Sequence, residues 1–173
     1  MTIDFEASCL PRHGRSYPIE VGVADGGMAR SWLIRPHDDW AGWGWTAEAE
    51  ALHGLTRERI ERDGQPAATV LAQLADVAQG CRMIADSPID QYWLDMLAAA
   101  AGVAAPFAIH HVTTLFDEQG ADEERVQAAV SYADGQVTTR HRAAGDALWL
   151  SALVSHIRGM AQIVPQPVLM AAQ

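Results

Sequence analysis

The sequence contains no lysine, only two cysteines among its 173 residues, and 7% aromatic residues. All 12 positive side chains are therefore arginines, which bind phosphate and carboxylate groups with a bidentate geometry that lysine lacks. Cys9 and Cys81 lie far apart and in no metal-ligand pattern, so we expect free thiols in a reducing compartment. These features indicate the cytoplasm rather than a disulfide-rich secreted domain.

The sequence also lacks long hydrophobic runs. No apolar stretch approaches the ~20 residues that a membrane-spanning helix needs, and no basic segment followed by an apolar stretch opens the chain. We therefore expect a soluble protein with no membrane partner and no secretory signal. The length suits one domain, which we expect to cover residues 1–173, with a core over about 1–162 and a C-terminal tail at 163–173.

The formal net charge is −10, whereas a basic surface is the usual electrostatic footprint of a nucleic-acid-binding protein. This charge argues against tight non-specific binding to a polyanion. It does not exclude a metal-dependent site for one strand end, because bound cations would cancel part of the negative charge. The arginines occur in three groups that suit phosphate, namely Arg12 and Arg15, then Arg57, Arg59 and Arg62, and then Arg140 and Arg142.

The order of the expected elements indicates an α/β domain. Three extended segments come first, and Gly26-Gly27 between the second and third is typical of a hairpin turn. We predict strands at 2–6, 17–23, 31–35, 81–85 and 107–112. We predict helices that start near residues 47, 56, 66 and 87, one near 123–132, and one from about 143 to 160. Antiparallel strands followed by strand–helix alternation predict a mixed sheet with helices on its faces.

Asp4 and Glu6 form the first candidate site, in the opening Ile3-Asp4-Phe5-Glu6. Side chains two apart on a strand point to the same face. Phe5 would then face the core, while the two carboxylates repel each other unless they are protonated, solvated or bound to a cation. Hard cations such as Mg²⁺ take ligands of this kind. The alternative is a solvated strand face without function.

A second acidic group, Asp86 and Asp90, directly follows the predicted strand at 81–85. Asp90 would lie in the first turn of the next helix, where its carboxylate can reach the carboxyl end of the sheet. An ordinary helix cap is the alternative, with Ser87 as N-cap, Pro88 at the first helical position and Asp90 favoured by the helix dipole. Asp86 is either a strand-end ligand or the cap itself.

The third candidate is His141 together with Asp146, at the start of the last helix. A histidine just before a helix and an acid in its first turns can converge on one site, where the imidazole can take a proton near neutral pH. A surface histidine beside an acid favoured by the helix dipole is the alternative.

Taken together, these motifs resemble the DEDDh branch of the 3′–5′ exonucleases, in the ribonuclease-H-like superfamily. The resemblance covers nearly the whole chain. It includes Asp4-Phe5-Glu6-Ala7-Ser8, the strand Ser16 to Gly22, His53-Gly54-Leu55-Thr56, Asp86 to Asp90, and His141 to Asp146. The chain departs from the family at Asp86, which is often Asn, at Ile89, which is often aromatic, and at Ala7-Ser8, where Thr is common.

The resemblance implies a ribonuclease-H-like fold: a mixed five-stranded sheet, with the first three strands antiparallel and the others parallel, flanked by helices. It implies that two Mg²⁺ or Mn²⁺ ions are bound by four acids, with Asp4 the bridge between the ions, and that His141 is the general base. Asp86 would be a weaker, substrate-binding member of the site, which adds negative charge beside the metals if it points inward. The four acids are Asp4, Glu6, Asp90 and Asp146.

The implied activity is metal-dependent hydrolysis at the 3′ end of single-stranded DNA or RNA, releasing nucleoside 5′-monophosphates. Leu55 resembles the family's apolar contact to the terminal base, and the backbone of Phe5, Ala7 and Ser8 would lie near the terminal sugar. Enzymes of this branch are often dimers, so a homodimer is one expectation. The alternative function is a non-catalytic nucleic-acid- or protein-binding module on the same fold.

Overall fold

The computed structural model describes residues 1–159, in which five strands form one sheet in the order β3-β2-β1-β4-β5. The first three strands pair antiparallel, β4 pairs parallel with β1, and β5 pairs parallel with β4. The predicted mixed sheet is thereby confirmed. The strands are β1 (Thr2–Ala7), β2 (Pro18–Asp25), β3 (Met28–Leu33), β4 (Met83–Ala85) and β5 (Ile109–His111).

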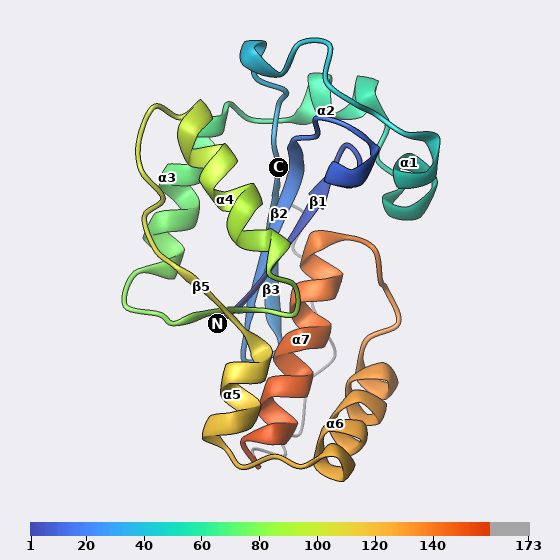
Figure 1. Ribbon diagram of the computed structural model, residues 1–173, viewed down its shortest axis with the longest axis vertical. Helices are drawn as coiled ribbons and strands as arrows, with labels where there is room; N and C mark the ends of the chain where they lie inside the picture. Colours follow the sequence, from blue (N-terminus) through green and yellow to red (C-terminus); the bar gives the residue numbers. More distant parts are fainter. Residues whose placement is uncertain (160–173) are drawn as a thin grey trace.

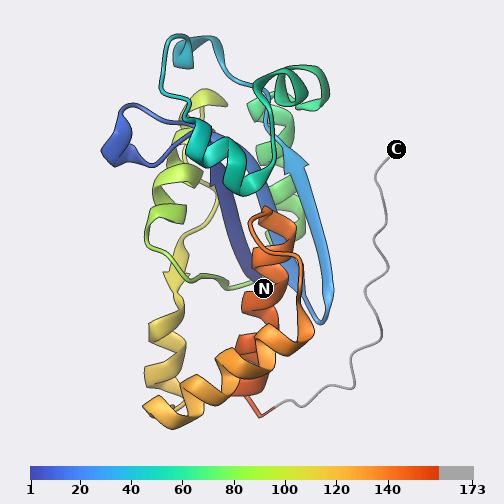
Figure 2. The same ribbon diagram turned by 90° about the vertical axis from the view of Figure 1, so that its right-hand side faces the viewer.

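Helices cover both faces of the sheet and both of its ends (Figures 1 and 2). Apolar residues of α3 and α4 pack in one core with Ile3 and Phe5 of β1. Residues of α5, α6 and α7 pack in a second core with Ile84 of β4. None of the described helices is long and apolar enough to span a bilayer. The helices are α1 (Ala47–His53), α2 (Arg57–Asp63), α3 (Ala67–Ala78), α4 (Ile89–Ala100), α5 (Val112–Glu118), α6 (Glu123–Gln136) and α7 (Ala143–Ile157).

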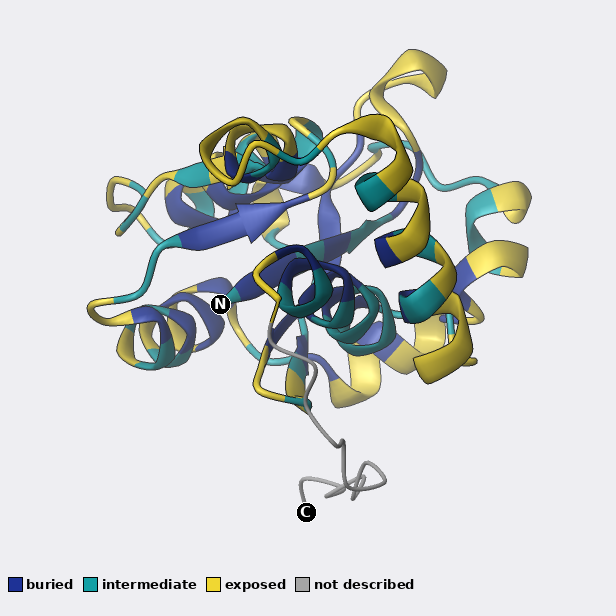
Figure 3. Ribbon diagram, turned by 90° about the horizontal axis from the view of Figure 1, so that it is seen from below, coloured by how far each residue is buried: buried dark blue, intermediate teal, exposed yellow. Residues whose placement is uncertain are grey.

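The alternation along β1 decides which side chains enter which layer. Ile3 and Phe5 are buried in the first core, so Asp4 and Glu6, which alternate with them, face the opposite layer and α7. Thr2 shares that face, and its hydroxyl donates to the carbonyl of Ala147 in α7 (2.6 Å). Figure 3 shows the sheet mostly buried, with exposed residues on the outer sides of the helices.

The structure departs from the expected elements mainly at α5, which the sequence did not indicate. Its β-branched residues favour a strand locally, but the His111 side chain accepts from the amide of Thr113 and caps a helix there. Val112 and Leu115 are buried in the second core, and that packing outweighs the local preference. The last helix ends at Ile157; its expected end at residue 160 and the tail 163–173 lie outside the described residues.

Gly22 lets α7 approach β2 closely. A Cβ atom at this position would lie 2.2 Å from the backbone carbon of Ala143. We expect Gly22→Ala to lower the free energy of unfolding by about 1–3 kcal/mol, the usual cost of overpacking, as measured by urea denaturation. Gly135 in α6 is the matched control, because no atom lies within 4 Å of its added Cβ and alanine favours a helix. Equal stability of the two variants would contradict the close packing of α7 on β2.

Candidate active site

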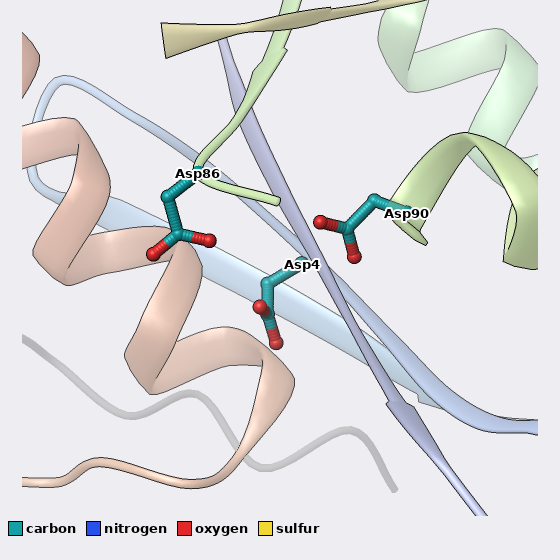
Figure 4. Close-up of side chains that lie close together, drawn as sticks. All are labelled: Asp4, Asp86 and Asp90. Carbon is teal, nitrogen blue, oxygen red and sulfur yellow. The ribbon is translucent and has the colours of Figure 1, made fainter. Parts of the chain in front are cut away.

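Three aspartates from different parts of the chain have side chains that lie close together (Figure 4). Asp4 lies on β1, Asp86 follows β4, and Asp90 lies in the first turn of α4. Ligand oxygens of these three residues all lie within 4.8 Å of one another. The strand register explains the meeting of the first two: Thr2 pairs with Ile84 across parallel strands, and Asp4 and Asp86 each lie two residues further along.

A second group of acids shares Asp4 with the first. Oxygens of Asp4, Glu6 and Asp146 also lie within 4.8 Å of one another. Glu6 comes from the same face of β1, and Asp146 comes from the first turn of α7, which crosses that face. Asp4 therefore lies between two groups of oxygen ligands, and each group is suited to a hard divalent cation.

The crowding of carboxylates raises their pKa values. Burial and the neighbouring Asp90 and Glu6 raise the pKa of Asp4 well above its ordinary value. Burial and Asp146 raise the pKa of Glu6 to about 8. Burial and Asp86 raise the pKa of Asp90 to about 8. Each carboxylate is thus destabilised in its charged form, which a bound cation would reverse.

Asp90 is the buried member of the site, at 2% exposure. Its Oδ1 accepts a hydrogen bond from the amide of Phe5 (3.1 Å), which fixes the carboxylate against β1. Its Oδ2 is buried and has no hydrogen-bond partner among residues 1–159. A buried oxygen without a partner is costly, and one that faces other carboxylates fits a cation ligand. The donor set therefore suits divalent metal binding.

Asp146 is held by the segment that precedes α7. The backbone amide of His141 donates to its Oδ2 (2.7 Å), and the Arg140 guanidinium forms an ion pair with its Oδ1. The Arg140 guanidinium also lies over the Trp149 ring, 4.2 Å from the centroid. His141 is exposed, so its imidazole is accessible from solvent, and its backbone is bonded to one of the acids. Its role as a base stays a prediction.

Asp86 is not a helix cap. The residue that precedes α4 is Pro88, and the hydroxyl of Ser87 accepts from the amide of Ile89 (3.3 Å). Asp86 instead joins the metal-ligand group as its exposed member, and desolvation by the surrounding protein and the nearby Asp146 raise its pKa. A ring nitrogen of His111 lies 2.9 Å from the Asp86 carbonyl oxygen, which ties β5 to this loop.

The expected substrate contacts need correction. Leu55 has 0% exposure and belongs to the first core, so it presents no surface to a base. Ser8 is also fully buried, and its amide and carbonyl both bond to other backbone groups, those of Tyr17 and Thr46. The Phe5 ring is buried and its amide is used by Asp90. Ala7, which is partly exposed, stays a predicted contact.

Sequence reasoning missed Glu20, which lies directly opposite Glu6 in the β1–β2 pairing. Its buried carboxylate binds the Arg142 guanidinium in a bidentate ion pair. Arg142 is therefore occupied by Glu20 and is not a free phosphate ligand, contrary to the expectation from its arginine group. The sequence did hold one indication: Glu20 is the single acid in the apolar stretch Tyr17 to Val23, and an acid that is buried in such a stretch needs a partner of opposite charge.

No protein-family model matches this sequence, and no curated protein matches it by sequence. Solved structures do match it. The nuclease domain of 3′hExo, a DEDDh family member bound to rAMP, has a TM-score of 0.68 at 16% identity, covering 91% of this chain and 90% of that chain. A full-length 3′-exonuclease has a TM-score of 0.66 at 14% identity, covering 91% and 80%.

Exonuclease I of E. coli, in complex with a dT13 oligonucleotide, has a TM-score of 0.63 at 11% identity. The match covers 91% of this chain but only 41% of Exonuclease I. At these identities the likeness establishes that this chain shares the fold of these solved exonuclease structures, and the fold alone.

Proposed function

We propose that this chain is a metal-dependent 3′–5′ exonuclease that removes nucleoside 5′-monophosphates from single-stranded DNA or RNA. The observation that carries the proposal is the position of Asp4, whose carboxylate belongs to both groups of three acids. A carboxylate shared by two groups of oxygen ligands suits a pair of divalent ions. The exonuclease-like fold supports the same conclusion.

The protein's part in this reaction is to gather carboxylate oxygens that would hold divalent cations beside the phosphodiester. Two Mg²⁺ or Mn²⁺ ions, when bound, would stabilise the attacking and the leaving oxygens of an in-line displacement. Asp4 would bridge them, with Asp90 and Asp86 on one side and Glu6 and Asp146 on the other. Phe5 orients Asp90 through its amide, so β1 contributes to the site with backbone as well as side chains.

His141 is the proposed general base. Its exposed imidazole lies directly before α7, and its own amide holds Asp146. A neutral imidazole at this position would take the proton of the attacking water and later release it to solvent. The exposure suits this role, because both the water and the released proton must exchange with solvent.

The substrate class is a single-stranded 3′ end. Matching structures are bound to rAMP in one case and to oligodeoxynucleotides in others, so both sugars are candidates. The net charge of −10 weakens non-specific binding to long polyanions. We therefore expect stronger dependence of activity on the divalent ion than on the length of the strand.

A labelled-oligonucleotide assay tests the proposal. We expect the wild-type protein with Mn²⁺ to shorten 5′-labelled strands one nucleotide at a time, and His141→Ala to lower kcat by about 10²–10⁴-fold, the usual contribution of a general base. His13→Ala is the matched control, because His13 is an exposed residue that takes no part in the site. Single-stranded DNA, duplex DNA and RNA should be compared.

The same assay distinguishes the proposed exonuclease from the alternative function, a non-catalytic binding module. A non-catalytic module would retain the oligonucleotide in a filter-binding measurement but leave its length unchanged with Mn²⁺ or Mg²⁺. Loss of label from the 5′ end first, or equal rates for wild type and His141→Ala, would also contradict the proposal.

A further inference from the structure

The Glu20 carboxylate accepts four hydrogen bonds, three of them from residues at the start of α7 and one from Ser31 of β3. Its Oε1 accepts from the Arg142 guanidinium and from the hydroxyl of Ser31, at 2.8 and 2.9 Å. Its Oε2 accepts from the Arg142 guanidinium at 2.8 Å and from the amide of Ala143 at 3.3 Å. The side chain is 1% exposed. Glu20 is therefore fully bonded and belongs to neither group of candidate metal ligands.

The bond to Ala143 replaces a helix cap. Arg142 is the N-cap residue of α7 and makes no side-chain capping hydrogen bond. Helix N-termini present unpaired amides that usually need an acceptor. Glu20, 122 positions away from Arg142 in the sequence, supplies that acceptor from β2. The start of α7 is thus bonded to β2, at the residue that pairs with Glu6 of β1.

His141 directly precedes this attachment, and its amide is bonded to Asp146. Its φ is +62°, and no other non-glycine residue among those described has a positive φ. A left-handed conformation is unfavourable for a non-glycine residue and persists only where surrounding contacts hold it. Two contacts do so here: the amide of His141 donates to Asp146, and the next residue, Arg142, is held by Glu20.

We propose that Glu20 and Arg142 are positioning residues, whose ion pair fixes the backbone of His141 and thereby the direction of its imidazole. This inference rests on the proposed exonuclease function. Relaxation of His141 to a negative φ would turn the imidazole away while Asp4, Glu6 and Asp90 kept their places. The ion pair therefore acts on His141 and, through the amide of His141, on Asp146, rather than on the acids of β1 and α4.

Arg142→Lys tests the proposal, since lysine keeps the charge but not the bidentate geometry. We expect kcat to fall about 10–100-fold, the scale of a small misplacement of a reacting group, with KM for the oligonucleotide changed less than about threefold by the same reasoning. We expect the same fall in kcat, with a similarly small change in KM, for Glu20→Gln. Added imidazole should restore part of the rate in both variants, as in His141→Ala.

Arg82→Lys is the matched control. Arg82 also makes a two-oxygen ion pair with a glutamate, Glu118, but on a surface remote from the acids. It should retain wild-type kcat. If Arg142→Lys lost activity only in proportion to its unfolded fraction, or gained nothing from imidazole, the ion pair would be merely structural and the inference would be wrong.

Amide hydrogen exchange tests the same geometry and does not depend on enzymatic activity. The amides of His141 and Ala143 are bonded to Asp146 and Glu20, so we expect both to exchange at least about tenfold faster in Arg142→Lys and Glu20→Gln, through local opening. Unchanged exchange would overturn the inference. An inactive wild type would instead overturn the proposed function, and with it the catalytic part of this inference.

Discussion

Asp4→Asn is expected to abolish exonuclease activity while making the metal-free protein more stable. Asn keeps the size of the side chain but removes the charge that both acidic groups share. Loss of a shared ligand should cost several kcal/mol of transition-state stabilisation, which corresponds to about a thousandfold or more in kcat. Nucleotide release from a labelled strand at saturating Mn²⁺ measures this loss.

The gain in stability has an electrostatic cause. Burial and the charges of Asp90, Glu6 and Asp146 oppose the ionised form of Asp4. At pH 8 without metal, removal of this charge should raise Tm by about 2–4 °C, equivalent to about 1 kcal/mol for a domain of this size. Asp25→Asn, at the exposed end of β2, should change neither activity nor Tm. A lower Tm for Asp4→Asn would argue against the repulsive site.

The second large effect is a pH-dependent stabilisation by metal. In the unfolded chain Glu6 and Asp90 ionise near their ordinary pKa values of 4.5 and 3.8, whereas in the folded protein both pKa values rise to about 8. Between pH 4 and 8 the folded state therefore binds more protons than the unfolded state. Stability without metal should fall as pH rises through this range and level off above about pH 8.

Metal ions should reverse that trend, because they bind the ionised carboxylates and release the protons. At pH 8 and a free Mn²⁺ concentration 100 times Kd, binding contributes about 2.7 kcal/mol, or a rise in Tm of roughly 5–10 °C. At pH 5 the rise should be small. Thermal denaturation in EDTA and in Mn²⁺ across this pH range measures both trends.

Titration calorimetry in buffers of different ionisation enthalpy gives an independent check, since it should detect proton release on Mn²⁺ binding at pH 7. A metal-induced rise in Tm of equal size at pH 5 and pH 8 would contradict the coupled acidic site. Asp4→Asn should lose most of the metal-induced rise, and Asp25→Asn should retain it.

The acids of the site were predictable from sequence because they occupy positions set by local structure. The period of two along a strand separates Asp4 and Glu6 from Ile3 and Phe5, and the end of a buried strand locates Asp86. Contacts across the fold were not predictable in this way. Leu55 was expected at a base and is buried instead, because its neighbours in the core come from distant segments.

The segment before α7 is another such case. The sequence placed His141 and Asp146 correctly at the start of a helix, but it carried no sign that Glu20 caps that helix. It also gave no sign that Arg140 pairs with Asp146 or that His141 adopts a left-handed backbone. The bond between Glu20 and Ala143 joins residues that are 123 positions apart in the sequence, and no local pattern indicates such a pairing.

The sequence by itself determined the order of the first three strands, the side of β1 that carries the acids and the residues that could bind a cation, since strand period and carboxylate chemistry are local properties. Only the tertiary structure decided that Asp4 is shared by two ligand groups, that Asp90 presents an unbonded oxygen to them and that Glu20 holds the helix carrying Asp146. Those relations arise because parallel pairing of β1 with β4 and the packing of α7 on β2 bring together residues that no local pattern connects.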